Sequence, residues 1–407
     1  MARPLLTEPR WLALWAAAAG YMLDAMDVLL YVFALQTIRA EFGLSNAQAG
    51  LVGSVSLIAS SAGGIAAGVL ADRIGRRRTL IYTILLYSLA SGGTALSSGL
   101  LDLCLWRALV GLGLGGEWSA GAVLVAESWP AEHRAKAIGF MQSGWALGYM
   151  LAAAVTALVL PRFGWRVLFL VGILPALLTV WIRRRVREPE IWSVARERPS
   201  PLAIFRPPLL RRTVLATALA SSVLLAYWGL FTWLPGFLSA PASEGGPGLS
   251  VVRTSGWMIA VQVGALLGYW SFGFLADRFG RRPVFLAYVL GAAALTPVYG
   301  NAPMWFDGAG AVMLALGPLL GFFGTGYFSL FGAMLAELYP TPVRGAGQGF
   351  TYNFGRCLAA LAPYATGRIA DRSGFGAALA LNSGFFLIAA ALSFTLPETR
   401  RTKLEEV

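Results

Sequence analysis

The chain has 407 residues, of which 57% are hydrophobic and only 13% are charged, and its formal net charge is +12. This composition excludes a water-soluble protein, because the core of such a protein could not hide so much apolar surface. The basic excess does not indicate nucleic-acid binding, because most of the 32 Lys and Arg residues fall on one side of a predicted membrane. That asymmetry is the positive-inside rule, and it predicts topology.

Apolar runs follow one another from Trp11 to Leu396, and each is long enough to cross a hydrocarbon core of about 30 Å. Backbone groups in lipid must be satisfied within their own element, so these runs predict helices. We therefore expect an all-α membrane protein with twelve transmembrane helices in two bundles of six. The protein is expected in the plasma membrane, with both termini in the cytoplasm.

In the first half, spans 1 and 2 are expected at about 11–35 and 47–70, followed by a basic loop at 72–78. Span 3 ends near 98, span 4 covers 103–126, and a second loop follows at 127–134. Span 5 begins after that loop, and span 6 begins at Trp165. Spans 7 to 12 repeat this plan. The segment from roughly 183 to 212 is rich in Arg, Glu and Pro and predicts a linker. The expected domains are a bundle at 1–185, a cytoplasmic linker at 186–211 and a bundle at 212–407.

Two motifs occur twice, once in each half. The stretch from Gly68 to Arg78, GVLADRIGRRR, returns 205 residues later at 273–283 as GFLADRFGRRP. The pattern Glu-x-x-Pro-x-x-x-Arg at 127–134 returns at 337–344, an offset of 210. Two independent motifs at nearly equal offsets indicate a duplication of six spans, with the halves related by an axis along the membrane normal.

On these motifs the chain resembles the major facilitator superfamily over essentially its whole length. The resemblance implies two bundles that rock about a central site. Within the superfamily, four pieces resemble proton symporters for sialic acid and lactate: DAMD at 24–27, GGEW at 115–118, ESWP at 127–130 and REPE at 187–190. The Asp-x-x-Asp of the first piece also resembles aromatic-acid proton symporters, which are the next most similar. The last piece and PETR at 397–400 also resemble sugar porters, but the Gln-rich signature of sugar porters is absent from span 7.

The repeated loops are predicted to act as a latch. Asp72 ends its helix, where the helix's own dipole disfavours negative charge, so it needs either an arginine or the N-terminus of another helix. Gly68 would permit the close approach of such a helix. The resemblance implies a latch that closes the cytoplasmic side, built from Gly68, Asp72, Arg73, Arg76, Gly273, Asp277, Arg278 and Arg281. The alternative is an ordinary positive-inside loop.

Ionisable residues within spans are costly and are therefore functional candidates. Asp24 and Asp27 lie on one helix face, and Glu117 lies near the middle of span 4. We expect these three acids to couple transport to protons, the alternative being a structural hydrogen bond between helices. Arg107 lies near the outer end of span 4. An interpretation in which its side chain snorkels to the membrane interface explains it at least as well as a functional role does.

Arg356 lies near the middle of span 11, about 18 Å along the helix from Arg344. Its planar guanidinium fits a carboxylate, so we expect it to bind a substrate anion. The alternative is a permanent pair with Asp24, Asp27 or Glu117. The substrate site is expected to include Tyr352, Asn353, Gln142, Trp118 and Tyr149 as well, with Trp145, Tyr227, Trp228 and Gln262 as further cavity candidates.

The sequence thus predicts a transporter that carries a small organic carboxylate together with protons, as a monomer in the lipid bilayer. The rivals are a proton-coupled exporter of drugs or metabolites, a sugar porter, and a sensor that binds without transport. An enzyme is not expected, because the sequence contains no Walker-type loop, metal constellation or Ser/His/Asp arrangement. No cofactor and no metal are expected.

Overall fold

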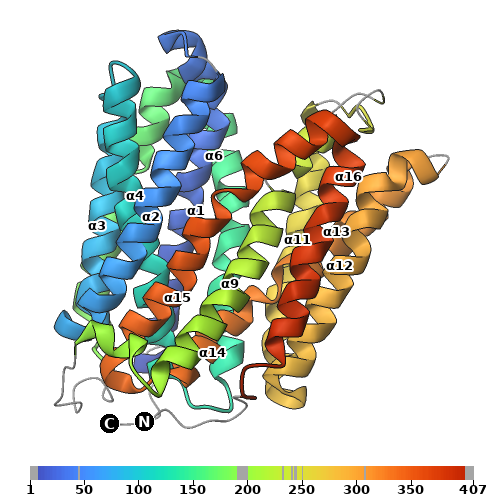
Figure 1. Ribbon diagram of the computed structural model, residues 1–407. Coiled ribbons are helices and arrows are strands. Elements are labelled where there is room, and N and C mark those ends of the chain that lie inside the picture. The colour runs from blue at the N-terminus through green and yellow to red at the C-terminus, as the bar shows by residue number, and fades with distance from the viewer. Residues whose placement is uncertain are drawn as a thin grey trace.

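The computed structural model describes residues 8–44, 46–189, 200–231, 233–239, 242, 245–249, 251–306 and 309–398, and the regular elements among them are all helical. The first half contains α1 (Pro9–Phe42), α2 (Asn46–Ile74), α3 (Arg76–Thr94), α4 (Leu100–Ser128), α5 (Arg134–Gln142), α6 (Gly144–Val171) and α7 (Pro175–Arg185). The second half contains α9 (Leu209–Phe231), α10 (Leu234–Ser239), α11 (Val251–Phe279), α12 (Arg281–Trp305), α13 (Ala309–Thr325), α14 (Phe328–Leu338), α15 (Arg344–Ala359) and α16 (Ala362–Ser393), with short 3₁₀ turns at η2 (Pro201–Phe205) and η4 (Thr341–Val343). The two sets of helices stand side by side in Figure 1.

Ten segments of the described chain are long and apolar enough to cross a membrane. Two more helical segments, α3 and α15 with the first part of α16, bring the number to the twelve that the sequence predicts. Both are less apolar for a visible reason: α3 begins with three arginines, and α15 is rich in glycine and polar residues. The arrangement of twelve helices in two bundles therefore fits the structure.

Glycines with positive φ mark where one span ends and the next begins. Gly164 (φ 75°) interrupts α6 just before Trp165, where the sequence predicts the start of span 6, and Gly374 (φ 80°) interrupts α16 at the same place in the second half. Gly75 (φ 107°) and Gly280 (φ 108°) likewise separate α2 from α3 and α11 from α12. Glycine adopts this backbone conformation without the steric penalty that a Cβ brings. Because the same turns occur at equivalent places in both halves, the internal duplication includes the turns between spans.

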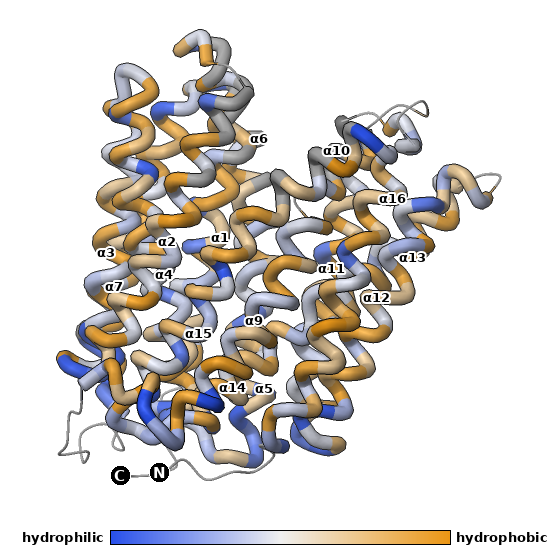
Figure 2. Tube along the Cα trace, viewed as in Figure 1, coloured by the Kyte–Doolittle hydropathy of each residue, from blue (hydrophilic) through white to orange (hydrophobic). Residues whose placement is uncertain are grey.

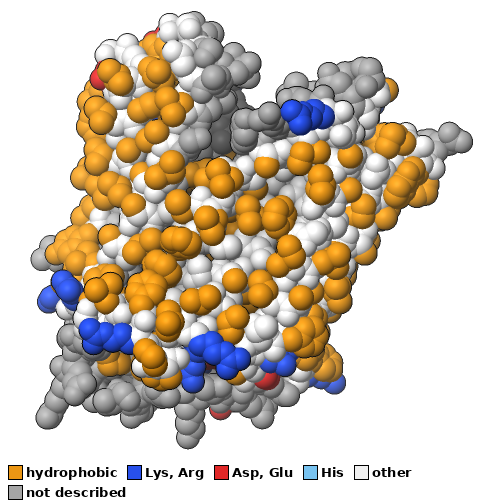
Figure 3. Space-filling view, in the orientation of Figure 1, with side chains coloured by type: hydrophobic (Ala, Val, Ile, Leu, Met, Phe, Trp, Pro, Cys, Tyr) orange, Lys and Arg blue, Asp and Glu red, His pale blue; other side chains and the backbone are white. Residues whose placement is uncertain are grey.

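The outer surface is apolar and the charges lie at one end. Large apolar side chains such as Leu96 and Leu101 are 75% and 78% exposed, which suits lipid and not water. Figure 3 shows apolar side chains over the flanks and a band of Lys and Arg at one end, which we call the basic end. In Figure 2 hydrophilic positions gather at the same end and also interrupt the apolar helices near mid-height.

The halves meet through two equivalent helix pairs. Helix α2 packs on α15, and α5 packs on α11. At the end away from the basic end, the surface is notched between the halves (Figure 3). The contact between halves is therefore made mainly toward the basic end and around mid-height.

The predicted domain boundaries stay predictions. Helix α7 ends at Arg185 and α9 begins at Leu209, but residues 190–199 of the linker lie outside the described part of the chain. The predicted cytoplasmic termini and the end of the PETR stretch also lie outside it.

Candidate functional site

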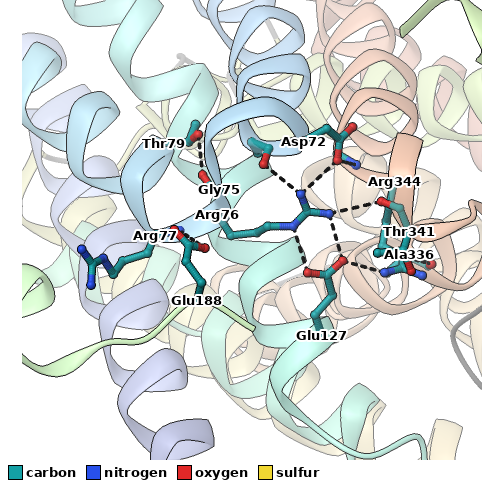
Figure 4. Close-up of polar contacts among 12 residues, drawn as sticks. Asp72, Gly75, Arg76, Arg77, Thr79, Glu127, Glu188, Ala336, Thr341 and Arg344 are labelled. Atoms are coloured by element: carbon teal, nitrogen blue, oxygen red, sulfur yellow. Dashed lines mark hydrogen bonds and ion pairs between the residues drawn. The ribbon is translucent and has the colours of Figure 1, made fainter. Parts of the chain in front are cut away.

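The first copy of the repeated motif forms an ion-pair network at the basic end (Figure 4). Arg76 donates from Nε and Nη2 to the two carboxylate oxygens of Glu127, at 2.9 and 3.0 Å, and pairs with Asp72 at 3.2 Å. Arg344, from the second half, donates to the same Glu127 at 2.6 Å. The Glu127 side chain is fully buried, so the charges are shielded from water and join α3, α4 and the start of α15.

The second copy repeats this network with the halves exchanged. Glu337, also fully buried, accepts from Arg281 of its own half at 3.4 Å. It also accepts from Arg134 of the first half at 2.8 Å. Arg281 pairs with Asp277 at 2.9 Å. Each half therefore sends an arginine to the buried glutamate of the other half.

The motif aspartates bind the N-termini of helices from the opposite half. Asp72 accepts hydrogen bonds from the backbone N–H groups of Gly345 and Ala346, at 3.0 and 2.7 Å, where α15 begins. Asp277 accepts one from the backbone N–H of Lys136, where α5 begins. The positive end of a helix dipole stabilises a carboxylate. The sequence analysis expected Asp72 to bind either an arginine or the N-terminus of another helix, and in the structure it binds both.

Glycine allows these helices to come so close. A Cβ on Gly68 would lie 2.3 Å from the carbonyl oxygen of Gly345, and a Cβ on Gly273 would lie 2.7 Å from that of Ala135. Real Cβ atoms do not approach backbone atoms so closely, so each contact requires a glycine.

The predicted latch residues divide into two groups. Gly68, Asp72 and Arg76 lie at the network in the first half, as do their counterparts in the second. Arg73 and Arg278 are exposed, and within the described part of the chain they do not belong to the ion-pair network. The predicted latch omitted four residues that lie at the centre of the ion-pair network: Glu127, Arg134, Glu337 and Arg344. The second repeated motif contains all four, so the signal was present but was given no role.

The two aspartates of α1 lie in different surroundings. Asp27 is fully buried, accepts a hydrogen bond from Ser91 and pairs with Nη1 of Arg107 at 3.3 Å. Arg107 is only 2% exposed, and its guanidinium carbon lies 5.1 Å from the centre of the Tyr31 ring. The snorkelling interpretation of Arg107 is therefore wrong, because the buried carboxylate of Asp27 on α1 holds the guanidinium inside the bundle.

Asp24 instead faces the seam between the halves. It is 4% exposed and lies within electrostatic reach of both Arg356 and Glu117. Glu117 is fully buried, and neither of its carboxylate oxygens has a hydrogen-bond partner among the described residues. A Cβ on Gly20 would lie 2.4 Å from Glu117 Oε1, so the glycine provides the space for this carboxyl. A buried acid without a partner is costly to ionise.

A central cavity lies between the halves. Its lining comes from α1, α6, α9, α11, α14 and α15 and consists of Tyr21, Trp145, Leu224, Tyr227, Trp228, Tyr269, Phe328, Tyr352 and Arg356. Arg356 is half-buried and donates from Nη1 to Ser60 Oγ at 2.8 Å. Its guanidinium carbon lies 5.1 Å from the centre of the Tyr352 ring.

The predicted substrate residues occupy two layers. Arg356 and Tyr352 line the cavity. Trp118 lies behind Tyr352 with the two rings stacked at 3.8 Å, and its Nε1 donates to Gln142 at 2.7 Å. Asn353 is fully buried and donates to Ser119 at 3.0 Å. The cavity lining does not include Trp118, Gln142, Asn353 or Tyr149, whose ring lies 6.1 Å from Phe33.

The prediction also missed part of the lining. Of the further candidates that the sequence analysis named, Trp145, Tyr227 and Trp228 line the cavity and Gln262 does not. The lining residues that were not named are Tyr21, Leu224, Tyr269 and Phe328. Phe328 lies 210 residues after Trp118, at the equivalent position of the repeat, and that offset would have found it. We find no comparable signal for Tyr269.

Comparison with known proteins decides the family. The chain matches the pattern of the Major Facilitator Superfamily over residues 17–252 and 248–407, which together cover nearly its whole length. The chain belongs to the major facilitator superfamily. The resemblance inferred from the repeated motifs is therefore confirmed, and so is the expectation that this superfamily member is a transporter and not an enzyme.

Three relatives of this superfamily member show the range of names among similar chains. A putative metabolite transport protein of Haemophilus influenzae is 36% identical, over 97% of this chain and 98% of its own length. A probable 4-methylmuconolactone transporter of Cupriavidus pinatubonensis is 34% identical, over 97% and 92%. A sialic acid transporter of Escherichia coli is 30% identical, over 96% and 93%. All three names describe transport of small molecules.

Proposed function

We propose that the protein is a symporter that carries a small organic carboxylate together with protons by alternating access. The observation that carries this proposal is the position of Arg356, which lines the cavity between the halves and has Asp24 within electrostatic reach. A half-buried guanidinium in a membrane protein needs an anionic partner. Asp24 supplies one when the site is empty, and a substrate carboxylate replaces it when the site is filled.

The basic end is assigned to the cytoplasm on the positive-inside rule. The latch then closes the cytoplasmic side in this structure, and the notch between the halves faces outward. The six-helix bundles at 1–185 and 212–407 rock about the seam, and a single chain contains the complete route. Opening inward requires the two buried glutamates, Glu127 and Glu337, to release the arginines of the opposite half.

Proton coupling is assigned to the acids of α1 and α4. Protonation of Asp24 removes its negative charge and frees Arg356 for a substrate anion. Glu117, which lies next to Asp24 and has no hydrogen-bond partner among the described residues, shares this proton or takes a second one. Asp27 and Arg107 form a second buried pair whose charges separate when Asp27 is protonated.

The substrate class is supported by the binding chemistry and by the relatives. A guanidinium fork binds a carboxylate through two parallel hydrogen bonds. One relative is named for 4-methylmuconolactone and another for sialic acid. We assign an organic acid to this chain on the fit between Arg356 and a carboxylate, with these names as support.

Uptake into proteoliposomes tests the proposal. The purified chain is reconstituted, and uptake of radiolabelled lactate, sialate and benzoate is measured with and without an inwardly directed proton gradient, with protein-free liposomes subtracted. We expect the gradient to accelerate uptake of at least one acid, and Asp24→Asn to abolish that acceleration while the acid still binds. Acid uptake that ignores the gradient would exclude proton coupling, and the absence of acid uptake and acid binding would exclude the function as a whole.

A further inference from the structure

The central cavity has an unusual lining for a site that binds a polar anion. Seven of its nine lining residues are aromatic, and they come from both halves. Tyr21 and Trp145 belong to the first half, with their rings 5.6 Å apart. The remaining five rings belong to the second half. A substrate held here is surrounded by π faces and ring edges.

Within the lining, two pairs of rings meet at right angles. Tyr227 meets the Phe328 ring edge to face at 5.1 Å, and the Trp228 ring in the same way at 5.5 Å. Aromatic pairs favour these offset and perpendicular geometries, and each pair contributes about 0.5–1.5 kcal/mol beyond the area it buries. A flat ring placed among them extends the same network, whereas a saturated ring of equal size gains only contact area.

Apart from Arg356, the polar groups of the lining are Tyr hydroxyls and Trp indole N–H groups, and two of the hydroxyls have partners. The Tyr227 hydroxyl has Trp145 as a polar neighbour, and the Tyr269 hydroxyl has Thr325. The lining contains no Asn, Gln, Asp or Glu among the residues described. The hydroxyls of Tyr21 and Tyr352 and the indole N–H of Trp228 are too few to pair every hydroxyl of a polyhydroxylated acid, and each unpaired hydroxyl costs free energy when buried.

The lining also contains a single cation. Arg356 is the only lining residue with a positive charge in the described chain, and it matches one carboxylate. A second carboxylate on the same ligand would lie among aromatic rings without a counter-charge. Burial of an unpaired charge is strongly unfavourable. The lining therefore selects against dicarboxylates.

From these observations we propose that the cavity takes a planar aromatic or conjugated monocarboxylate, with its carboxylate on Arg356 and its ring among Tyr227, Trp228 and Phe328. This inference rests on the proposed function and narrows its substrate class. It separates flat monoacids from sugar acids, from short hydroxy acids and from dicarboxylates, all of which the function alone would admit.

Binding to the purified full-length protein tests the inference with matched ligands. Benzoate is compared with cyclohexanecarboxylate, which has the same charge and size but is not flat. It is also compared with benzamide, which lacks the charge, and with terephthalate, which has a second carboxylate. Lactate and sialate complete the set. Affinities are obtained from ligand-dependent thermal stabilisation, which avoids passive leakage of weak acids through lipid.

We expect benzoate to bind about two- to tenfold more tightly than cyclohexanecarboxylate, which is the ratio that one or two aromatic contacts provide. Benzamide, terephthalate, lactate and sialate should all bind more weakly than benzoate. Phe328→Leu and Trp228→Leu should each reduce the ratio of benzoate to cyclohexanecarboxylate affinity toward one. Phe322→Leu, which alters a ring outside the cavity lining, should leave the ratio unchanged.

The failures of the two proposals are distinguishable. If lactate, sialate, terephthalate or cyclohexanecarboxylate binds as tightly as benzoate or more tightly, the planar-acid inference is overturned while the carboxylate function stands. If benzoate is preferred but both leucine variants keep the wild-type ratio, the placement of the ring is overturned. If none of the acids binds or is taken up, the proposed function fails, and the inference fails with it.

Discussion

Arg356 is the residue on which the proposed substrate site depends, and its geometry distinguishes it from a lysine. The guanidinium donates from Nη1 to Ser60, and the Arg356 side chain lines the cavity. We expect Arg356→Lys to weaken binding of a transported acid about 10- to 100-fold, because one charge-assisted hydrogen bond of about 1.5–3 kcal/mol is lost with the fork. Equilibrium binding to the purified protein measures this. Arg211→Lys, at an exposed position of α9, is the control, and an unchanged affinity in Arg356→Lys would remove the residue from the site.

Substitution of Asp27 tests whether its buried ion pair with Arg107 stabilises the folded first half. Both side chains are almost inaccessible, so Asp27→Asn leaves an arginine charge without a counter-charge. We expect a loss of about 3–5 kcal/mol, seen as a lower thermal midpoint in detergent, because breaking a buried pair costs more than removing both charges.

The double variant Asp27→Asn with Arg107→Gln should recover much of that loss. Asp102→Asn, which removes an acid at an exposed hydrogen bond on α4, should leave the midpoint unchanged. A double variant that is less stable than Asp27→Asn alone would show that the two side chains act independently of each other.

At the scale of elements, the contact between α2 and α15 depends on the absence of a side chain. A Cβ on Gly68 would meet the backbone of α15, whereas a Cβ on Gly53 of the same helix would meet nothing within 4 Å. We expect Gly68→Ala to separate the two helices and expose the start of α15. Hydrogen exchange at the amides of Gly345 and Ala346, which Asp72 protects, should accelerate at least about tenfold. Gly53→Ala should leave these amides protected, and equal protection in both variants would contradict the close-packing argument.

The elements also show what could be predicted from the sequence. Helix existence, the break before Trp165 and the partners of Asp72 follow from apolar length, glycine and the helix dipole, which are local properties. The pair of Asp27 and Arg107 could not be predicted, because helical spacing gives a face but not the neighbouring helix. For the same reason Trp118 and Gln142 were expected in the cavity lining, whereas they lie one layer behind it. The second repeated motif was recognised, yet its glutamates were given no role, because one arginine that each of them binds lies in the opposite half and could not be inferred from local spacing.

At the scale of the whole molecule, the two buried glutamates each bind arginines of both halves, and the proposed latch holds the basic end closed through them. Glu127→Gln and Glu337→Gln each keep the size of the side chain but remove the charge that two arginines share. We expect each single variant to produce a minor population open at the basic end, and the double variant to make that population the major one. Pulsed EPR distances between labels at Arg78 and Arg211, both exposed, in a background without Cys104 and Cys357, measure the opening.

Glu132→Gln, an exposed acid in the loop after α4, is the control for this experiment and should keep the wild-type distance. The same distance distribution in the wild type and in the double variant would mean that other contacts hold the basic end closed.

The reciprocal bonding at the basic end has a consequence for the origin of the protein. The aspartate of each half binds the start of a helix in the other half, and the glutamate of each half receives an arginine from the other. No half completes these bonds by itself. An unduplicated six-helix ancestor with one copy of each motif would nevertheless be self-complementary across a twofold axis. Gene fusion would then have joined two subunits that already recognised each other.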